Sequence, residues 1–281
     1  MMPSYPDIDW RSSSTGSLAS LYEQHGVVVL RNLFEKNDWE ALASVARMAF
    51  AIGDAMTGLL PAEKLPEDLA HGLVRHGWVT WPRTMEWLRL LGLDGRIELS
   101  AVLKKVETAA GAFYKHDCRI LDASSFRRHR GEDDGQGLER VGYTHEGGTF
   151  VPWHRDYAVA GTAQFGEDAV NFWIPFADVG EHAPSLELVL GSHFYMKSIP
   201  VSDPLENLTP EWIDQHLPNA PRWTPHCKVG DVIAFDHQTV HQTQWLKGPM
   251  RARMSLELRC GPASTETKRG PLEENGPRRF T

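Results

Sequence analysis

The feature that most constrains the fold is a change in sequence texture near residue 117. From there on, short β-prone runs alternate with Gly, Pro and Asp turn signals. Such runs are typical of antiparallel sandwiches and jelly rolls, because each short strand must be followed by a reversal of the chain. The expected strands are Cys118–Leu121, Val141–Thr144, Thr149–Trp153, Val170–Phe176, Ser185–Leu190, Val232–Phe235 and Met254–Arg259.

The preceding part of the chain shows helical patterning instead. Apolar residues recur at helical spacing, and Gly26 is the expected stop of the first helix, before a buried run of valines. The expected elements are a helix and a strand within 17–31, a helix over Asp38–Phe50 capped by Asn37, and a helix over Gly95–Lys115.

The length of 281 residues suits one large domain. We therefore expect a single domain over 1–281, in which a helix-rich part packs against a β core. The expected parts are 1–117 (helices), 118–260 (core, with loop insertions at 122–140 and 194–228 and a short helix at Pro210–Leu217) and 261–281 (a loosely packed tail).

The net charge of the chain argues against nucleic-acid binding. The formal net charge is −8, which disfavours a nucleic-acid partner because phosphate binding needs a basic face. The basic cluster Arg127–Arg130 is followed at once by acidic residues, so a solvated loop is the favoured interpretation, and contact with an anionic substrate is the alternative.

Targeting signals are not evident in the sequence. The first ten residues, MMPSYPDIDW, lack the basic and apolar segments of a signal peptide, and no apolar run approaches the roughly 20 residues that span a bilayer. The three cysteines are scattered and form no C-x-x-C pair, which favours a reduced, cytoplasmic setting. We expect a small-molecule substrate and no membrane partner; the oligomeric state stays open.

One His-x-Asp pair, His154 and Asp156, is the strongest chemical signal. A single pair of this kind is common by chance in a chain with 13 histidines, but this one follows a β-prone run at the entrance to a loop. Residues i and i+2 of a strand point to the same side, so both side chains would converge on one metal ion. The alternative is a surface histidine near an aspartate.

A second imidazole is expected from the segment after the run Gly230-Asp-Val-Ile-Ala-Phe. His241 is favoured as a metal ligand, and His237 is expected at the surface or behind a ligand. Two imidazoles and one carboxylate on one face of a metal, with the other face open, form the facial site of non-haem Fe(II) oxygenases. A satisfied core histidine is the alternative for His241.

Two arginines follow on the next expected strand. Arg251, Arg253 and Ser255 share one face by parity, and a guanidinium can grip a carboxylate with two parallel hydrogen bonds. The alternative is a pair of surface arginines on an edge strand.

Taken together, these segments resemble the phytanoyl-CoA dioxygenase family of Fe(II)- and 2-oxoglutarate-dependent oxygenases. The resemblance spans residues 26–259 and lies in Gly26-Val-Val-Val-Leu-Arg, Trp153-His-Arg-Asp, Trp173-Ile-Pro-Phe-Ala-Asp, Leu190-Gly-Ser-His, Gly230-Asp-Val-Ile-Ala-Phe and the pair His241 and Arg251. It implies an α+β, mostly β fold, with a double-stranded β-helix (a cupin-like jelly roll) and N-terminal helices packed against it.

The resemblance also implies roles for residues. His154, Asp156 and His241 would bind iron, and Arg251 would hold the distal carboxylate of 2-oxoglutarate. The family places that arginine about eleven residues after the second histidine, whereas the offsets here are ten and twelve, so Arg251 and Arg253 both remain candidates. Ser255, four residues after Arg251, favours Arg251. Leu190 stands where the family often has proline, and we interpret Gly191-Ser192-His193 as a structural turn.

Five further residues are candidates for the pocket. Tyr143, Asn171 and Trp173 are candidates for contact with the co-substrate, and Phe150 could wall the pocket. Core packing is the favoured role for Phe150 and Trp173. Tyr157 is expected to border the substrate.

The implied activity uses Fe(II), 2-oxoglutarate and O2, and releases succinate and carbon dioxide. Hydroxylation of an aliphatic C–H bond in a small metabolite or natural-product intermediate is the expected outcome. Desaturation, epimerisation and cyclisation use the same chemistry. Asp156 favours hydroxylase-type chemistry over halogenation, since related halogenases replace this carboxylate with a small residue. The rival hypotheses are a cupin-like metal enzyme that does not use 2-oxoglutarate and a non-catalytic protein with a relict metal site.

Overall fold

The computed structural model describes residues 5–74, 77–94, 96–129, 150–159, 169–199, 208–246 and 250–263. Its strands are β1 (Asp7–Asp9), β2 (Val27–Arg31), β3 (Trp78–Thr80), β4 (Cys118–Ile120), β5 (Ser125–His129), β6 (Val170–Pro175), β7 (Leu186–Val189), β8 (Arg222–Trp223), β9 (Val232–Asp236), β10 (His241–Thr243) and β11 (Arg253–Pro262). Its helices are α1 (Thr15–His25), α2 (Lys36–Leu59), α4 (Trp81–Leu90), α5 (Ser100–Tyr114), α7 (Asp156–Val159), α8 (Ser192–Lys197) and α9 (Pro210–His216), with single turns at Ala62–Lys64 and Asp68–Leu73.

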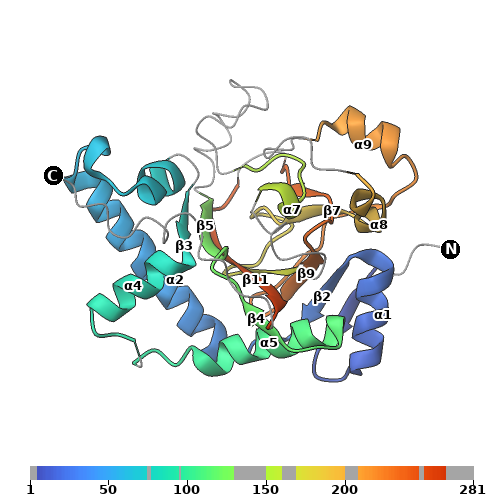
Figure 1. Ribbon diagram of the computed structural model, residues 1–281, viewed down its shortest axis with the longest axis horizontal. Helices are drawn as coiled ribbons and strands as arrows, with labels where there is room; N and C mark the ends of the chain where they lie inside the picture. The colour runs from blue at the N-terminus through green and yellow to red at the C-terminus, as the bar shows by residue number, and fades with distance from the viewer. Residues whose placement is uncertain are drawn as a thin grey trace.

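The strands form two sheets. Within the described residues, the larger sheet has the order β1-β2-β9-β6-β11-β5-β3, with β4 paired to β11, and the smaller has the order β10-β7-β8. The long pairings are antiparallel, and only β1 and β2 run parallel. Figure 1 shows the two sheets around a common interior, with α7 above it. This arrangement confirms the predicted jelly-roll core with N-terminal helices against it.

Strand β2 shows how the sequence separates two cores. Val27 and Val29 face the space between the sheets, whereas Val28 and Leu30 face the helices, because side chains alternate along a strand. A strand that is buried on both faces reads as a continuous apolar run. The interior also contains Trp173, Leu188 and Phe235.

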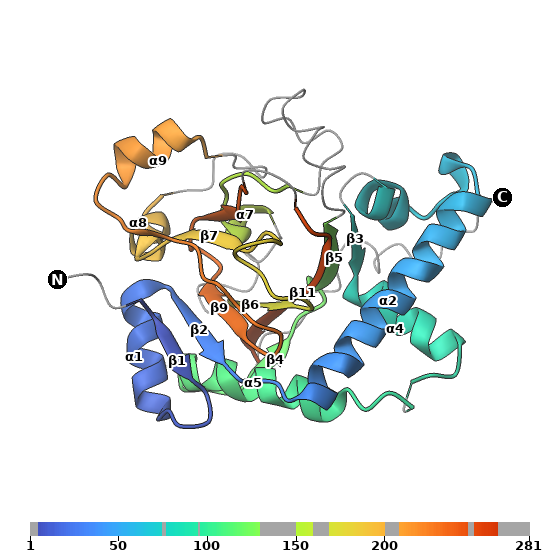
Figure 2. The same cartoon turned by 180° about the vertical axis from the view of Figure 1, so that it is seen from behind.

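Helices α1, α2 and α5 cover the outer face of the larger sheet (Figures 1 and 2). Helix α2 has the length and hydropathy of a membrane-spanning helix, but Leu42, Val45, Ala46, Ala49 and Phe50 pack into the helix–sheet core. A core helix passes the same test of length and composition.

Several predicted elements have different bounds in the structure. Helix α2 is capped by Glu35 rather than Asn37: the Glu35 N–H donates to Asp38 Oδ2 at 2.9 Å. The helix then continues to Leu59, nine residues beyond the predicted end at Phe50, since the first proline after it is Pro61. Gly26 ends α1 as predicted, with φ +68°.

The β elements differ as well. The predicted loop insertion 122–140 contains strand β5, which pairs with both β11 and β3. Residues 127–129 of the basic cluster therefore lie in the larger sheet rather than in a solvated loop. The predicted strand Thr149–Trp153 is replaced, over its described residues, by an irregular segment that leads to a single bridge between His154 and His241. The predicted strand Val141–Thr144 lies outside the described residues.

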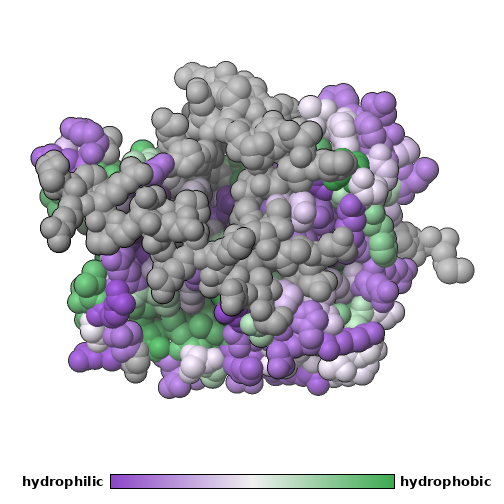
Figure 3. Space-filling model, in the orientation of Figure 1, coloured by the Kyte–Doolittle hydropathy of each residue, from purple (hydrophilic) through white to green (hydrophobic). Residues whose placement is uncertain are grey.

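The three cysteines are buried and free. Among the residues drawn in colour, Figure 3 shows mainly hydrophilic side chains and an apolar patch at the lower left, over the region of α4 and α5. These helices border a groove that shares no lining residue with the interior cavity described below. Its apolar lining consists of Pro82, Met85, Leu88, Leu93, Ile97, Leu99 and Leu103.

Candidate metal centre

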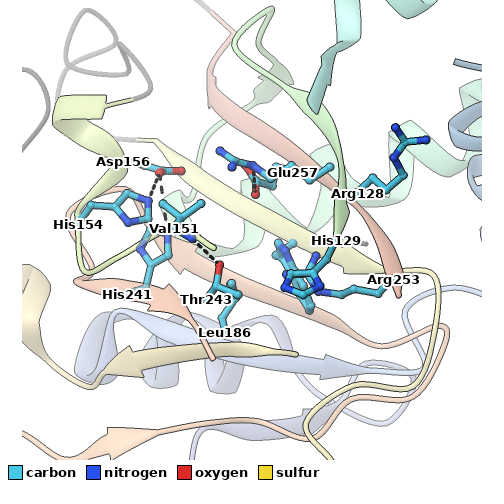
Figure 4. Close-up of a pocket in the computed structure, with 12 residues that line it drawn as sticks. Arg128, His129, Val151, His154, Asp156, Leu186, His241, Thr243, Arg253 and Glu257 are labelled. Atoms are coloured by element: carbon cyan, nitrogen blue, oxygen red, sulfur yellow. Dashed lines mark hydrogen bonds and ion pairs between the residues drawn. The ribbon is translucent and has the colours of Figure 1, made fainter. Parts of the chain in front are cut away.

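The two candidate imidazole ligands lie side by side because the backbone pairs them. The His154 N–H donates to the His241 carbonyl at 2.9 Å, and the reverse bond is 3.0 Å. The ring centroids are consequently 4.2 Å apart. Asp156 begins α7 next to them, and one potential ligand atom from each of the three residues lies within 4.8 Å of the others. Figure 4 shows the three side chains converging.

Both imidazoles are oriented by backbone carbonyls. Nδ1 of His154 lies 2.7 Å from the Pro152 carbonyl, and Nδ1 of His241 lies 3.0 Å from that of Thr239. When Nδ1–H donates to a carbonyl, the lone pair of Nε2 is left for the cavity, as in metal sites. Burial, assisted by the neighbouring His154, lowers the pKa of His241 to about 3. His241 is therefore neutral at physiological pH, the form that binds metal.

Asp156 uses its two oxygens differently. Oδ1 faces the imidazoles, 3.3 Å from Nε2 of His154 and 3.8 Å from Nε2 of His241. Oδ2 accepts from the guanidinium of Arg259 at 2.8 Å. Burial by itself would raise the pKa of this carboxyl, but the charge of Arg259 outweighs it and holds the pKa well below its usual value. The carboxylate is thus ionised.

Arg259 is a site residue that sequence reasoning missed. Its position in the strand could have identified it. Every second residue of β11 is polar, namely Arg253, Ser255, Glu257 and Arg259, and the residues between them pack into the helix–sheet core. One strand therefore presents a row of polar, buried side chains to the interior.

Arg253, rather than Arg251, lies at the cavity. Its side chain is buried, lines the same cavity as the three ligands, and donates to the Pro184 carbonyl at 2.6 Å and to Ser255 Oγ at 2.9 Å. Arg251 is exposed and lines a separate groove with Asp7 and Asp9. Arg251 precedes β11, which begins only at Arg253, and it therefore lies outside the cavity.

Arg253 has the properties of an anion-binding residue. Burial lowers its pKa to about 10, so it remains charged at neutral pH. Within the described part of the chain, no carboxylate oxygen lies within ion-pair distance of its guanidinium. A buried cation without a partner is costly, and a bound anion would relieve that cost.

Two other predicted residues lie on β6. Trp173 lines the cavity, and the guanidinium of Arg253 lies 4.8 Å from its ring centroid. Asn171 is buried, and its amide nitrogen and oxygen have no hydrogen-bond partner among the described residues. Tyr143 lies outside the described residues.

Residues predicted to border the site lie as follows. Phe150 is half-buried and contacts the exposed Trp245 edge-on, with ring centroids 5.7 Å apart, so it lies at the margin of the core. Tyr157 packs edge-on against His237 at 5.0 Å. His237 is fully buried, so the predicted alternative that it lies at the surface was wrong.

The basic cluster divides between two faces of β5. Arg127 Nε lies 2.7 Å from Glu257 Oε1. The side chain of Arg128 points away from the ligands (Figure 4) and pairs with Asp54 at 2.6 Å. Arg130 lies outside the described residues. The cavity is lined by Arg127, Arg128, His129, Val151, His154, Asp156, Trp173, Leu186, His241, Thr243, Arg253 and Glu257.

Comparisons with known proteins agree with this geometry. Residues 123–252, which include all three candidate ligands, match the family model phytanoyl-CoA dioxygenase (PhyH). No curated protein sequence matches the chain.

Solved structures share the fold at low identity. The carbocyclase SnoK from nogalamycin biosynthesis, described as non-heme and alpha ketoglutarate dependent, has 16% identity and a TM-score of 0.59, covering 92% of this chain and 87% of its own. The epimerase SnoN, in complex with Fe3+, alpha ketoglutarate and nogalamycin RO, has 18% identity and a TM-score of 0.58, covering 89% and 84%. EctD from S. alaskensis, with 2-oxoglutarate and 5-hydroxyectoine, has 16% sequence identity and a TM-score of 0.58, and the match covers 94% of this chain and 82% of EctD.

Proposed function

We propose that this chain, a member of the phytanoyl-CoA dioxygenase family through residues 123–252, is an Fe(II)- and 2-oxoglutarate-dependent dioxygenase. One observation carries the proposal: a cluster of two imidazoles and one carboxylate shares a buried cavity with Arg253, an arginine that has no carboxylate partner among the described residues. The cluster fits the metal, and the arginine fits an anionic co-substrate.

The donor set fits Fe(II). Two neutral imidazoles and a carboxylate on one face are the ligands of non-haem Fe(II) oxygenases, whose other positions stay open. The structure supports this choice because His241 is neutral and Asp156 is ionised before any metal binds. The buried Asn171 amide, with no partner among the described residues, fits a polar ligand in the same interior.

Arg253 is proposed to bind the distal carboxylate of 2-oxoglutarate. Its planar guanidinium suits a carboxylate because two parallel N–H···O bonds can form. Trp173 beneath it and Ser255 beside it restrict its rotation, so little side-chain entropy remains to be lost on binding. The surrounding burial excludes water, which strengthens the charge–charge interaction.

When bound, iron with 2-oxoglutarate and O2 supplies an oxidant for an aliphatic C–H bond, with release of succinate and carbon dioxide. We propose hydroxylation of a small metabolite or natural-product intermediate. The neighbours named as an epimerase and a carbocyclase make the same oxidant diverted to epimerisation or ring closure the alternative.

The test is an anaerobic titration of the metal-free protein with Fe(II) and then 2-oxoglutarate. Chelation of iron by the keto acid should give a weak visible charge-transfer band. Asp156→Ala should abolish the band, whereas the surface variant Arg251→Gln should keep it. A folded, iron-loaded wild type without a band would contradict 2-oxoglutarate binding and favour a cupin-like enzyme that does not use this co-substrate.

A further inference from the structure

We infer that Arg259 is a positioning residue that restricts Asp156 to one metal-binding oxygen. The inference rests on the proposed function, since it concerns the same metal centre. It assigns a role to an arginine that lies 103 positions from its carboxylate in the sequence.

The contacts of Asp156 divide between the two oxygens. Oδ2 accepts from two atoms of the Arg259 guanidinium, Nη2 at 2.8 Å and Nε at 3.3 Å. Oδ1 is the atom that faces the imidazoles of His154 and His241. The guanidinium therefore engages Oδ2, and Oδ1 is the oxygen that would bind a metal ion together with the two imidazoles.

Arg259 is held firmly enough to act in this way. It is 3% exposed and lies in β11, where its backbone N–H donates to Ser124 Oγ at 2.9 Å. Its Nη1 donates to the carbonyl of Ala123. The guanidinium is thus clamped to the turn between β4 and β5 on one side and to Asp156 on the other.

Glu257 supports the same orientation. Its Oε2 lies 3.2 Å from Nη2 of Arg259, and its Oε1 lies 2.7 Å from Nε of Arg127. Asp156, Arg259, Glu257 and Arg127 thus form a chain of alternating charge beside β5 and β11, in which the buried charges of Asp156 and Arg259 have partners of opposite sign. Arg259 cannot turn away from Asp156 without also leaving Glu257.

The consequence concerns the number of open positions on the metal. A carboxylate can bind a metal through one oxygen or two. In an octahedral site, three protein atoms leave three positions, which a chelating keto acid and O2 would fill. A two-oxygen aspartate would take one of those positions. By engaging Oδ2, Arg259 keeps that position open.

The test measures metal binding rather than turnover. Metal-free wild type and Arg259→Gln are titrated with Co(II) anaerobically, by calorimetry and by visible absorption, and 2-oxoglutarate is then added. We expect the variant to bind Co(II) roughly 10- to 100-fold more weakly, the loss typical of a residue that supports a ligand. We also expect an altered Co(II) spectrum that responds less to 2-oxoglutarate.

Two further variants separate positioning from general stability. Arg259→Lys keeps the charge and should recover part of the affinity but not the spectrum, because one ammonium cannot reproduce the two-atom contact. Arg83→Gln is the matched control: Arg83 pairs with Asp68 at 3.0 Å, lines neither the cavity nor the cluster, and should leave Co(II) binding unchanged.

Three results would overturn the inference. Wild-type affinity and spectrum in a folded Arg259→Gln would do so directly. If that variant does not fold, Glu257→Gln must weaken Co(II) binding, and an unchanged titration would count equally against the role of Arg259. A wild type that takes up no Co(II) would overturn the metal centre itself, which distinguishes failure of the proposed function from failure of this inference.

Discussion

The guanidinium of Arg253 lies over the indole of Trp173, 4.8 Å from the ring centroid, inside the jelly roll. The two residues come from paired strands, β11 and β6, and both face the interior between the sheets. A cation over an aromatic face is favourable, more so when it is desolvated. The contact occupies the face of the guanidinium, while Nε donates to the Pro184 carbonyl and Nη1 to Ser255 Oγ. Within the described residues this leaves the N–H groups of Nη2 and the second N–H of Nη1 for a carboxylate.

Replacement of this arginine should therefore be selective for co-substrate binding. Arg253→Gln should weaken 2-oxoglutarate binding roughly 100-fold, because a charge-assisted, bidentate contact of about 2–3 kcal/mol is lost. Fe(II) affinity should change little. Calorimetry on the iron-loaded protein under nitrogen measures both. Arg251→Gln is the control, and a larger loss in that variant would reverse the assignment.

Gly26 should not tolerate a side chain. Its φ of +68° is costly for other residues, and a Cβ atom would lie 2.2 Å from His193 Nδ1 and 2.7 Å from Thr239 Oγ1. We expect Gly26→Ala to lower the free energy of unfolding by about 2–4 kcal/mol, through left-handed strain and overpacking. Urea denaturation measures the change.

Gly58→Ala is the comparison for that variant. Gly58 lies in α2, and an added Cβ would meet no atom within 4 Å. Alanine there should stabilise the protein by up to about 1 kcal/mol, because glycine is a poor helix former. Equal effects of the two substitutions would contradict the packing described around Gly26.

His193 should make stability depend on pH. Burial lowers its pKa to about 4, while Nε2 lies 3.1 Å from the Glu23 carbonyl. Between pH 6.5 and about 4 the unfolded chain binds the proton more readily, so stability falls as the pH falls through this window. A difference of about 2.5 in pKa corresponds to at most about 3 kcal/mol.

The measurement is the unfolding free energy of metal-free wild type and His193→Gln across this pH range. The variant should show a shallower decline toward acid. The lowered pKa of His241 also makes stability fall toward acid, but it does so equally in wild type and variant. The difference between the two stability curves therefore reports on His193. Parallel curves would mean that His193 is not buried in its neutral form.

Arg155, between the two ligands of the His-x-Asp pair, should be essential for stability. It is fully buried, and its guanidinium donates to the carbonyls of Met196 at 2.6 Å and Ile199 at 3.0 Å and to Gln238 Oε1 at 2.9 Å. Arg155→Leu leaves these acceptors buried without a donor and should cost about 3–5 kcal/mol. Arg222→Leu, at a surface ion pair with Asp214, should cost under about 1 kcal/mol in the same urea experiment.

Much of this molecule follows from local patterns. Alternation along β2 and β6 separates side chains that face the interior from those that face the helices, because a strand directs successive residues to opposite sides. His154 and Asp156 were predicted to converge for the same reason. In the structure Asp156 begins α7 instead of ending a strand, yet the two side chains still meet near His241.

The positions of Arg251 and Arg127 could not be predicted, because they depend on where β11 begins and on which strands pair with each other. Parity placed Arg251, Arg253 and Ser255 on one face, but only the pairing of Arg253 with His129 shows that β11 starts at Arg253 and leaves Arg251 at the surface. Similarly, the segment around Arg127 looked like a loop until its pairing with β11 and β3 made it a strand.

The sequence by itself predicted the jelly-roll class from short-range patterns and the three candidate ligands from residue type and motif order, while the expected co-substrate came from the family resemblance. Tertiary structure alone decided that Arg259 pairs with Asp156, that Trp173 lies beneath Arg253 and that His237 is buried. These contacts join strands far apart in the chain, and register between such strands is set by the packing of the whole sheet rather than by any local signal.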